Sequence, residues 1–298
     1  MTASGRRLQL RKSEWIILAY YVYVAALSPF FAAHSDNRFQ PEIVLVLAAV
    51  LITFLVRAQR TRWTTTVTTI RDWLPILLTL VAFREMEMFL PRFFDLHLES
   101  VWVKQDRLVL NTWHLHSAIE SLGPVLPFYF ELCYFLVYGV SAFCIAALYL
   151  TGHRRSVDDF YFTYLLGTLG AYALFPYFPS RPPRLVYPLL DPPTVTTWVR
   201  NLNLFILQHA TIHVAVFPSA HVSSAFSAAW SMFILLPRRK MFGSVALAYA
   251  ISVSIATVYG RYHYVADVVA GFGISLVAGA LTFLLRRKLL ICNQCIEK

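Results

Sequence analysis

The stretch "YGRYHYVADVVAG", residues 259–271, carries an arginine, a histidine and an aspartate within otherwise apolar sequence. His263 and Asp267 are four residues apart, so they lie on one face of a helix. The Asp267 carboxylate can hold the imidazole in one tautomer and stabilise its positive form, which predicts an activated histidine. An isolated pair of this kind is also typical of a structural hydrogen bond, so the prediction depends on the residues around it.

Two other polar islands interrupt apolar sequence, "FPSRPPR" at residues 178–184 and "FPSAH" at residues 217–221. The second supplies another imidazole, His221, and a hydroxyl, Ser219, just before a predicted helix whose first N–H groups can bind an anion. The islands also provide three arginines, Arg181, Arg184 and Arg261. Guanidinium groups bind phosphate oxygens and neutralise a transferring phosphoryl group, so the three islands predict phosphoryl transfer.

The composition predicts an integral membrane protein. Of 298 residues, 58% are hydrophobic and 14% charged, against roughly 45–50% and 25% in soluble domains. The formal net charge of +10 does not indicate a nucleic-acid partner, because the basic residues form short clusters between apolar runs rather than one amphipathic face. Four cysteines are too few for a disulfide framework.

The apolar runs predict an all-α, multi-pass transmembrane helix bundle. A bilayer core about 30 Å thick needs roughly 20 apolar residues per helix. Eight segments approach that criterion: 14–33, 42–57, 73–91, 125–151, 157–178, 219–236, 241–260 and 263–285. Short loops on the side of the amino terminus are rich in Lys and Arg, which predicts cytoplasmic termini and places all three polar islands on the outer face. We expect a protein of the plasma membrane with an extracytoplasmic site.

The sequence predicts a single membrane domain, residues 1–298, with accessory spans over residues 14–91 and the catalytic core over residues 125–285. Residues 92–124 have amphipathic spacing, which predicts interfacial helices on the outer face. Two smaller features are interpreted as structural and not as catalytic. Arg84 and Glu87 are spaced as an ion pair between packed spans, and the terminal "CNQC" lacks the second cysteine pair that a metal site needs.

The order and spacing of "RPPR", "PSAH" and "HYVAD" resemble the three-part signature of the type 2 phosphatidic acid phosphatase superfamily. The "PPR" form of the first motif and the segment "VKQDRLVLN" look like the inositol phosphorylceramide synthase-like (inositolphosphotransferase-like) branch, and "GRYHY" is similar to the sphingomyelin synthase pattern. Leu174 and Thr257 stand where the superfamily has a lysine and an arginine. These departures favour the synthase-like branch, with Arg261 as the replacing cation.

This resemblance implies a six-helix phosphatase-like core and a role for each motif residue. His263 would be the nucleophile that forms a phosphohistidine, Asp267 would orient it, and His221 would be the general acid for the leaving oxygen. Arg184 and Ser219 would bind phosphate, with Arg181 and Arg261 as further cations. The implied substrate is a lipid phosphate, phosphodiester or diphosphate. Water or an alcohol would be the acceptor, and the sequence leaves hydrolase and transferase both open.

A second class of function, a proton-coupled transporter of an anionic solute, would use His263, Asp267, Glu85 and Glu87 as a proton relay. Inverted repeats or helices broken at the bilayer midplane would be its expected signs, and the sequence shows neither. For the enzyme we expect no cofactor. The sequence has no Asp-rich cluster on the outer side and no DxxDG pattern of metal-dependent alcohol phosphotransferases, which predicts metal-independent chemistry.

Overall fold

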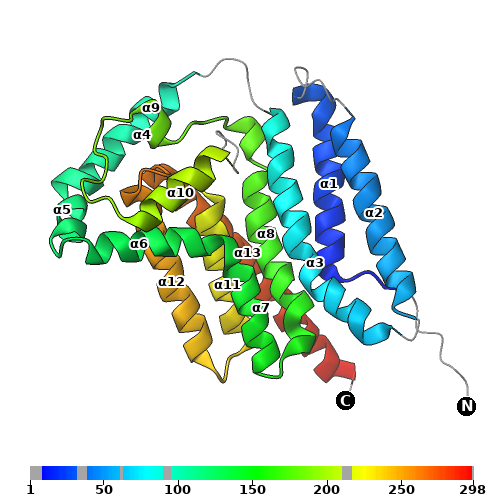
Figure 1. The fold of residues 1–298 in the computed structure, drawn as a ribbon. Helices are drawn as coiled ribbons and strands as arrows, with labels where there is room; N and C mark the ends of the chain where they lie inside the picture. Colours follow the sequence, from blue (N-terminus) through cyan, green and yellow to red (C-terminus); the bar gives the residue numbers. More distant parts are fainter. Residues whose placement is uncertain (1–8, 32–38, 61–62, 90–94, 210–216, 297–298) are drawn as a thin grey trace, which may run out of the picture.

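The computed structural model describes residues 9–31, 39–60, 63–89, 95–209 and 217–296, and these residues form helices and no strands (Figure 1). The long helices are α1 (Lys12–Phe31), α2 (Gln40–Ala58), α3 (Thr64–Glu85), α12 (Lys240–Tyr259) and α13 (Val265–Ile296). Those of intermediate length are α6 (Val125–Leu136), α7 (Val140–Leu150), α8 (Val157–Tyr172), α10 (Trp198–His209) and α11 (Ala220–Leu235). The shorter helices are α4 (His97–Arg107), α5 (Leu115–Glu120) and α9 (Pro183–Val186). The predicted all-α fold is confirmed.

Among the described residues, six helical segments are long and apolar enough to cross a membrane: Lys12–Phe30, Gln40–Ala58, Thr64–Phe89, Val125–Leu150, Lys240–Tyr259 and Val265–Lys288. The multi-pass membrane bundle is therefore confirmed. The other two predicted spans, 157–178 and 219–236, correspond to the shorter helices α8 and α11, each of 16 residues. At 1.5 Å per residue each rises about 24 Å. Most residues of both helices are buried, so α8 and α11 form the interior of the bundle rather than its lipid-facing wall.

The third span begins at Thr64, nine residues before the start of the predicted range 73–91. The predicted range left Arg71 and the threonines before it outside the span. In the structure the Thr68 hydroxyl donates to the carbonyl of Thr64 at 2.7 Å, which satisfies it inside the helix. Arg71 is buried and its Nη2 lies 2.7 Å from Oε2 of Glu14 on α1. Thr68 and Arg71 are thus compatible with this span because both have partners.

The predicted span 125–151 is divided into two helices by a 3₁₀ turn, η3 (Val137–Gly139). In Figure 1, α6 crosses one end of the bundle, whereas α7 runs along the bundle from the turn. Tyr134 and Tyr138 lie just before and within this turn. The bend therefore brings two aromatic side chains of one apolar segment to the end of the bundle where the polar islands gather.

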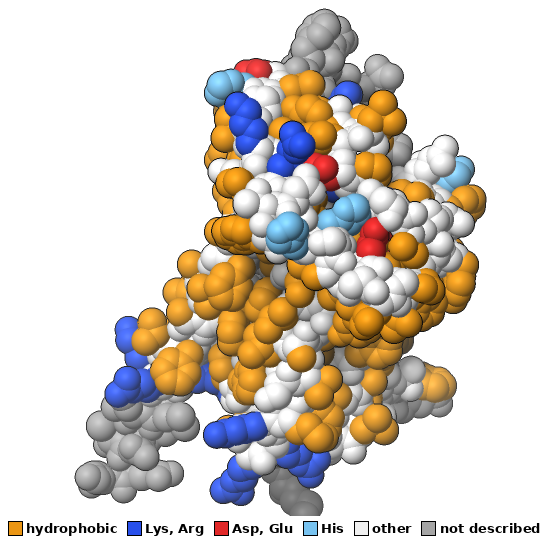
Figure 2. All heavy atoms as spheres, turned by 90° about the vertical axis from the view of Figure 1, so that its left-hand side faces the viewer, with side chains coloured by type: hydrophobic (Ala, Val, Ile, Leu, Met, Phe, Trp, Pro, Cys, Tyr) orange, Lys and Arg blue, Asp and Glu red, His pale blue; other side chains and the backbone are white. Residues whose placement is uncertain are grey.

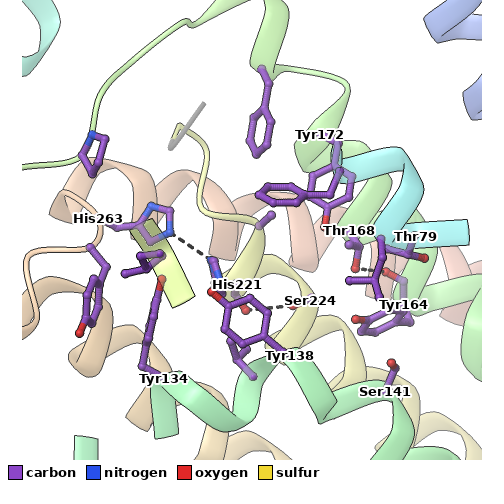
Figure 3. A pocket seen from close by; sticks show the side chains of 18 of the residues that line it. Thr79, Tyr134, Tyr138, Ser141, Tyr164, Thr168, Tyr172, His221, Ser224 and His263 are labelled. Carbon is purple, nitrogen blue, oxygen red and sulfur yellow. Dashed lines mark hydrogen bonds between the residues drawn. The ribbon is translucent and has the colours of Figure 1, made fainter. Parts of the chain in front are cut away.

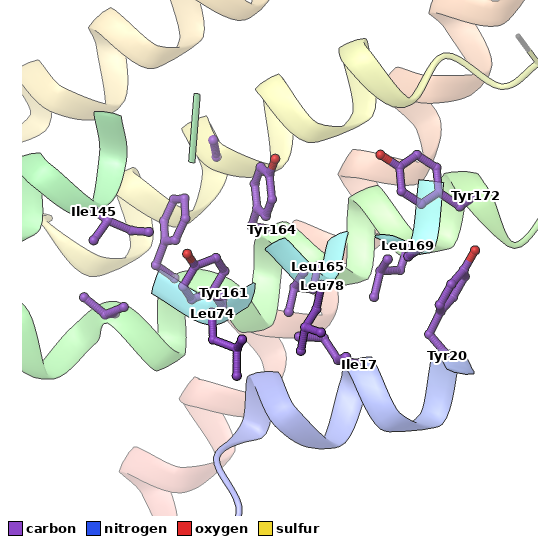
Figure 4. Close-up of a cluster of buried hydrophobic side chains, with 14 of the residues drawn as sticks. Ile17, Tyr20, Leu74, Leu78, Ile145, Tyr161, Tyr164, Leu165, Leu169 and Tyr172 are labelled. Carbon is purple, nitrogen blue, oxygen red and sulfur yellow. The ribbon is translucent and has the colours of Figure 1, made fainter. Parts of the chain in front are cut away.

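The helix α8 packs against both the accessory helices and the core. The side chains buried where α1, α3, α7 and α8 meet include Ile17, Tyr20, Leu74, Leu78, Ile145, Leu165 and Leu169 (Figure 4). On another side α8 approaches α11 so closely that a Cβ at Gly167 would collide with the Ser227 hydroxyl. The Ser223 hydroxyl of α11 donates to the Gly167 carbonyl at 2.9 Å. These contacts join α1 and α3 to the core in one packed unit.

The two ends of the bundle differ in character. The start of α1 and the end of α13 lie at one end, and α4, α5, α9 and α10 lie over the other (Figure 1). The loop between α11 and α12, at the end where α1 starts, exposes Arg238, Arg239 and Lys240. Figure 2 shows Lys and Arg side chains at both ends of the visible face, accompanied at the upper end by His and acidic side chains, with a broad hydrophobic region between the two ends.

Arg84 and Glu87 form the expected ion pair, with Nη2 of Arg84 3.6 Å from Oε2 of Glu87. The side chains are 53% and 54% exposed, however, so the pair lies on the helix surface and not between packed spans. The side chains of Cys292 and Cys295 lie outside the described part of the chain.

Candidate active site

The two histidines of the polar islands meet at the end of the bundle covered by α4, α9 and α10. His221 is the second residue of α11, and His263 lies in the turn between α12 and α13 (Figure 3). Nδ1 of His221 is 3.2 Å from Nε2 of His263. The ring centroids are 5.4 Å apart at an interplanar angle of 62°. Two imidazoles separated by about forty residues of sequence are therefore in hydrogen-bonding contact.

Asp267 holds the other side of the His263 ring. Its Oδ2 atom lies 3.2 Å from Nδ1 of His263 and accepts the backbone N–H of Tyr264 at 2.9 Å. The Asp267 side chain is completely buried and that of His263 nearly so. Because Nδ1 faces the carboxylate, Nε2 is the nitrogen of His263 that faces His221.

Backbone contacts set the separation of the two histidines. The N–H of Ser219 donates to the Asp267 carbonyl at 2.9 Å, which ties the start of α11 to the first turn of α13. Gly271 permits this close approach, because a Cβ there would collide with the Ser219 carbonyl oxygen. The distance between the rings thus depends on helix packing and not on flexible side chains alone.

A cavity of about 120 Å³ lies beside the histidines, well above the roughly 10–15 Å³ needed for one water molecule. The wall around the imidazoles includes Tyr134, Tyr138, Pro182, Arg184, Ala220, His221, Tyr262 and His263. The wall away from them is formed by α3, α7 and α8 through Ile76, Thr79, Leu80, Phe83, Ser141, Tyr164, Thr168 and Tyr172 (Figure 3). The cavity therefore has a cationic end with hydroxyl groups and a more apolar end.

Arg184 is the one of the three predicted arginines that lines this cavity. It lies in the short helix α9, which begins at Pro183. Its backbone N–H donates to the Arg261 carbonyl at 3.2 Å, and its guanidinium carbon lies 5.9 Å from the ring centroid of Tyr262. The loop containing the first motif is thereby attached to the turn that contains His263, and a permanent positive charge lies on the same cavity as both imidazoles.

Arg261 is placed differently and does not line the cavity. It adopts a left-handed φ of 61°, is 2% exposed, and donates through Nη1 to Oδ2 of Asp106 at 2.6 Å. Oδ1 of Asp106 accepts the N–H of Val265 at 2.8 Å. Burial raises the pKa of Asp106 to about 6, although the Val265 N–H and Arg261 act in the opposite direction. The pair ties α4 to the turn that contains His263.

Ser219 and Arg181 also lie outside the cavity lining. Ser219 is the N-cap of α11, and its buried hydroxyl accepts the Val222 N–H at 3.4 Å. The next two residues, Ala220 and His221, do line the cavity, so the partial positive charge at the start of α11 faces it. Arg181 is exposed, and its backbone N–H donates to Glu99 at 3.0 Å. Phosphate binding by Ser219, Arg181 and Arg261 stays a prediction.

A buried network that the sequence interpretation missed supports the rings of the site. Glu131 on α6 accepts Nη1 of Arg200 at 2.7 Å, the amide of Asn203 at 2.8 Å and the hydroxyl of Tyr262 at 2.6 Å. The Tyr262 ring stacks on Tyr134, with centroids 3.9 Å apart. Glu131 thereby fixes the outermost ring of an aromatic stack.

The same stack reaches His221. Its ring lies 5.2 Å from the centroid of Tyr134 at an angle of 29°, and Tyr138 meets it edge-on at 5.4 Å. A signal for this network was present in the sequence, because Glu131 is the acidic residue in the apolar run 125–150 and an ionisable residue in a span is costly unless paired. Its partner Arg200 is far away in sequence, so the pairing was not visible.

These features describe a multi-pass membrane protein with a paired-histidine site at one end of its helix bundle. Residues 99–281, more than half of the chain, match the PAP2 superfamily, the superfamily of type 2 phosphatidic acid phosphatases. The chain belongs to this superfamily, which supports a phosphatase-type function. Comparison with curated proteins and with solved structures gave no match. The match begins in α4 and ends in α13, so α1, α2 and α3 lie outside it.

Proposed function

We propose that this protein is a membrane lipid phosphatase or phosphotransferase that works through a phosphohistidine at His263. The observation that carries the proposal is the 3.2 Å contact between His221 and His263, with Asp267 on the far side of the nucleophile. Arg184 on the same cavity supplies the cation that a phosphate group requires. Superfamily membership supports the same class of chemistry.

The hydrogen bonds assign a proton to each ring. An ionised Asp267 accepts a proton held on Nδ1 of His263, which leaves a lone pair on Nε2. The contact between that nitrogen and His221 then places a proton on Nδ1 of His221. These tautomers are inferred from the network. Nε2 of His263 is then the unprotonated nucleophile. To act as the acid, His221 must also carry a proton on Nε2, so that the imidazolium becomes a neutral imidazole when it gives up its Nδ1 proton.

Phosphoryl transfer follows in two steps. Nε2 of His263 attacks phosphorus, the P–N bond forms as the bond from phosphorus to the leaving oxygen breaks, and His221 gives its Nδ1 proton to that oxygen. Arg184 and the start of α11 offset the negative charge on the phosphoryl oxygens. Water or an alcohol then attacks phosphorus, His221 takes up its proton, and the P–N bond breaks.

The second step defines whether the enzyme is a hydrolase or a transferase. The motif forms "PPR" and "GRYHY" favour the inositolphosphotransferase-like branch, in which an alcohol accepts the group. Every residue named in the first step serves both outcomes. A mass-spectrometric screen of lipids incubated with purified protein distinguishes them, because hydrolysis releases free phosphate and transfer yields a lipid with a new headgroup.

We propose that the site faces the extracytoplasmic side of the plasma membrane. The start of α1, the end of α13 and the basic loop Arg238–Lys240 lie at one end of the bundle, and the histidines lie at the other. The positive-inside rule places the basic end, and with it both termini, in the cytoplasm. A tag at either terminus should react with antibody only after cells are permeabilised. Labelling of intact cells would contradict this orientation.

The phosphoenzyme itself tests the proposal. Wild-type protein mixed with a lipid phosphate labelled at phosphorus should acquire an acid-labile, alkali-stable label, and His263→Asn should acquire none. His221→Ala should acquire label from a substrate with a good leaving group and lose it slowly, because its general base is missing. His209→Asn is the matched control, since His209 is an exposed histidine whose ring contacts the Phe205 carbonyl and does not line the cavity. Undiminished label in His263→Asn would refute the nucleophile.

The geometry gives no support for the transporter alternative. Glu85 is buried and neither of its carboxylate oxygens has a hydrogen-bond partner among the described residues, but Glu85 does not line the cavity that contains the histidines. Glu87 is exposed and paired with Arg84. No continuous relay from these carboxyl groups to Asp267 is visible in the described structure. Uptake of an anionic solute by protein-containing liposomes that is lost in His263→Asn, with no phosphoenzyme formed by the wild type, is the result that would revive this alternative.

A further inference from the structure

The cavity beside the histidines extends to a helix that lies outside the superfamily match. Four residues of α3 form part of its wall: Ile76, Thr79, Leu80 and Phe83. Their spacing of three, one and three residues places them on one face of the helix. The N-terminal helices therefore do more than pack against the core, because α3 completes the cavity at the end away from Arg184.

Two residues of the cavity lining also lie on the surface, one on α3 and one in the η3 turn. Among the described residues that line the cavity, the exposed ones are Leu80, at 49%, and Tyr138, at 39%. Leu80 belongs to a helix long and apolar enough to span the membrane, so its exposed surface contacts lipid and not water. The part of the lining that reaches the surface at Leu80 thus faces the bilayer.

The α3 side of this wall is apolar in effect, although it contains Thr79, and the side formed by α7 and α8 adds the hydroxyl-bearing Ser141, Tyr164, Thr168 and Tyr172. The Thr79 hydroxyl donates to the Pro75 carbonyl at 2.7 Å, and the Thr168 hydroxyl on α8 donates to the Tyr164 carbonyl at 2.8 Å. Each hydroxyl is therefore satisfied within its own helix. Together with Ile76 and Phe83 this wall offers hydrocarbon surface to a ligand, in contrast to the arginine and imidazoles at the other end.

We propose that the hydrocarbon chain of the substrate lies against α3 and leaves the site for the bilayer between Leu80 and Tyr138, so that α3 selects substrates by their chains. This inference rests on the proposed function for the phosphate end of the ligand. The substrate class is then an amphiphile whose phosphate lies at the histidines and whose chain passes sideways into the membrane. A soluble phosphate would contact only the polar end of the cavity.

Leu80→Trp tests this, because the larger side chain narrows the proposed exit without touching the histidines. With phosphatidic acids in the same detergent, kcat/KM for the dioleoyl lipid should fall at least tenfold, whereas that for the dihexanoyl lipid should stay within twofold. Leu77→Trp is the matched control on the same helix, since Leu77 is 62% exposed and does not line the cavity. Equal effects on both lipids, or no effect on either, would overturn the inference. If Leu80→Trp does not fold, Leu80→Phe and Ile76→Phe add less side-chain volume on the same side of the cavity.

A readout that does not need turnover separates this inference from the proposed function. A lipid phosphate with a diazirine on its chain should crosslink to the segment Thr64–Glu85 of wild-type protein, and Leu80→Trp should reduce that crosslink. Crosslinking to α3 without consumption of any lipid phosphate would refute the proposed function and leave the chain site standing. Crosslinks confined to other helices would refute the chain site whatever the activity.

Discussion

Nδ1 of His221 lies 3.2 Å from Nε2 of His263, so in this structure the proposed general acid rests directly against the proposed nucleophilic nitrogen. The two rings are held from opposite sides, His263 by Asp267 and His221 by the stack through Tyr134. A phosphorus atom that bonds to Nε2 must therefore displace His221 by a small movement of its ring. The proposed mechanism requires the displaced nitrogen to stay within reach of the leaving oxygen, which lies opposite Nε2 in an in-line displacement.

The contact between Asp267 and His263 predicts the effect of Asp267→Asn. An amide NH₂ group that faces the ring donates a hydrogen bond and cannot accept one from the Nδ1–H of His263. The ring is then no longer held in one orientation with its proton on Nδ1. We expect kcat to fall by about 10²–10⁴-fold, as for other carboxylates that orient a catalytic histidine. Single-turnover measurements should place the loss in phosphoenzyme formation. A normal rate of label uptake would contradict the orienting role.

Arg184 and Arg261 should respond differently to the same substitution. Arg184→Gln removes the cation from the cavity, and we expect kcat/KM to fall by about 10²–10³-fold with little change in thermal stability. The substitution Arg261→Gln removes a guanidinium from a buried pair and leaves Asp106 without its charged partner. We expect a destabilisation of about 3–5 kcal/mol, measured by thermal unfolding in detergent.

The stability deficit of Arg261→Gln should depend on pH. Burial raises the pKa of Asp106 to about 6, so ionisation of this carboxyl lowers folded-state stability as the pH rises through 6, and Arg261 offsets that cost. Below pH 6 the carboxyl is neutral and no longer needs the arginine. The difference in melting temperature between the variant and wild type should shrink as the pH falls from 7.5 to 5. A constant difference would show that the pair acts through packing alone.

Glu131→Gln should alter catalysis from a distance. The substitution keeps the size of the side chain but removes the charge that pairs with Arg200 and receives the Tyr262 hydroxyl. The stack that holds His221 then loosens, and we expect kcat to fall about tenfold with KM unchanged and with an altered pH profile of kcat. Glu87→Gln is the control, because Glu87 lies on the exposed surface. A change in stability with an unaltered pH profile would assign Glu131 a structural role only.

Chelation tests the prediction of metal-independent chemistry. The described residues contain no group of three His, Cys, Asp or Glu side chains placed to hold a metal ion. Activity should therefore be unchanged after incubation with excess EDTA and removal of the chelator. Complete loss, restored by a divalent cation, would contradict the prediction.

The sequence was sufficient for those properties that depend on local pattern. Apolar runs near the length of a bilayer span predicted the helices. The i, i+4 spacing placed His263 beside Asp267 on one helix face, and the opposite directions of successive spans placed His221 at the same end of the bundle. Local pattern failed at Thr64 and at Val137–Gly139. There, hydroxyl bonds within a helix and a bend in a continuous apolar run determine the structure.

The tertiary structure determines where each of the charged residues lies relative to the cavity. The sequence offered all three arginines as phosphate-binding cations, yet Arg184 lines the cavity, Arg261 is buried against Asp106 and Arg181 is exposed. Helix packing determines which guanidinium reaches a cavity, because a buried charge must find its partner wherever the fold brings one. For the same reason no local pattern could show that α3, far from every motif, forms the wall opposite the histidines.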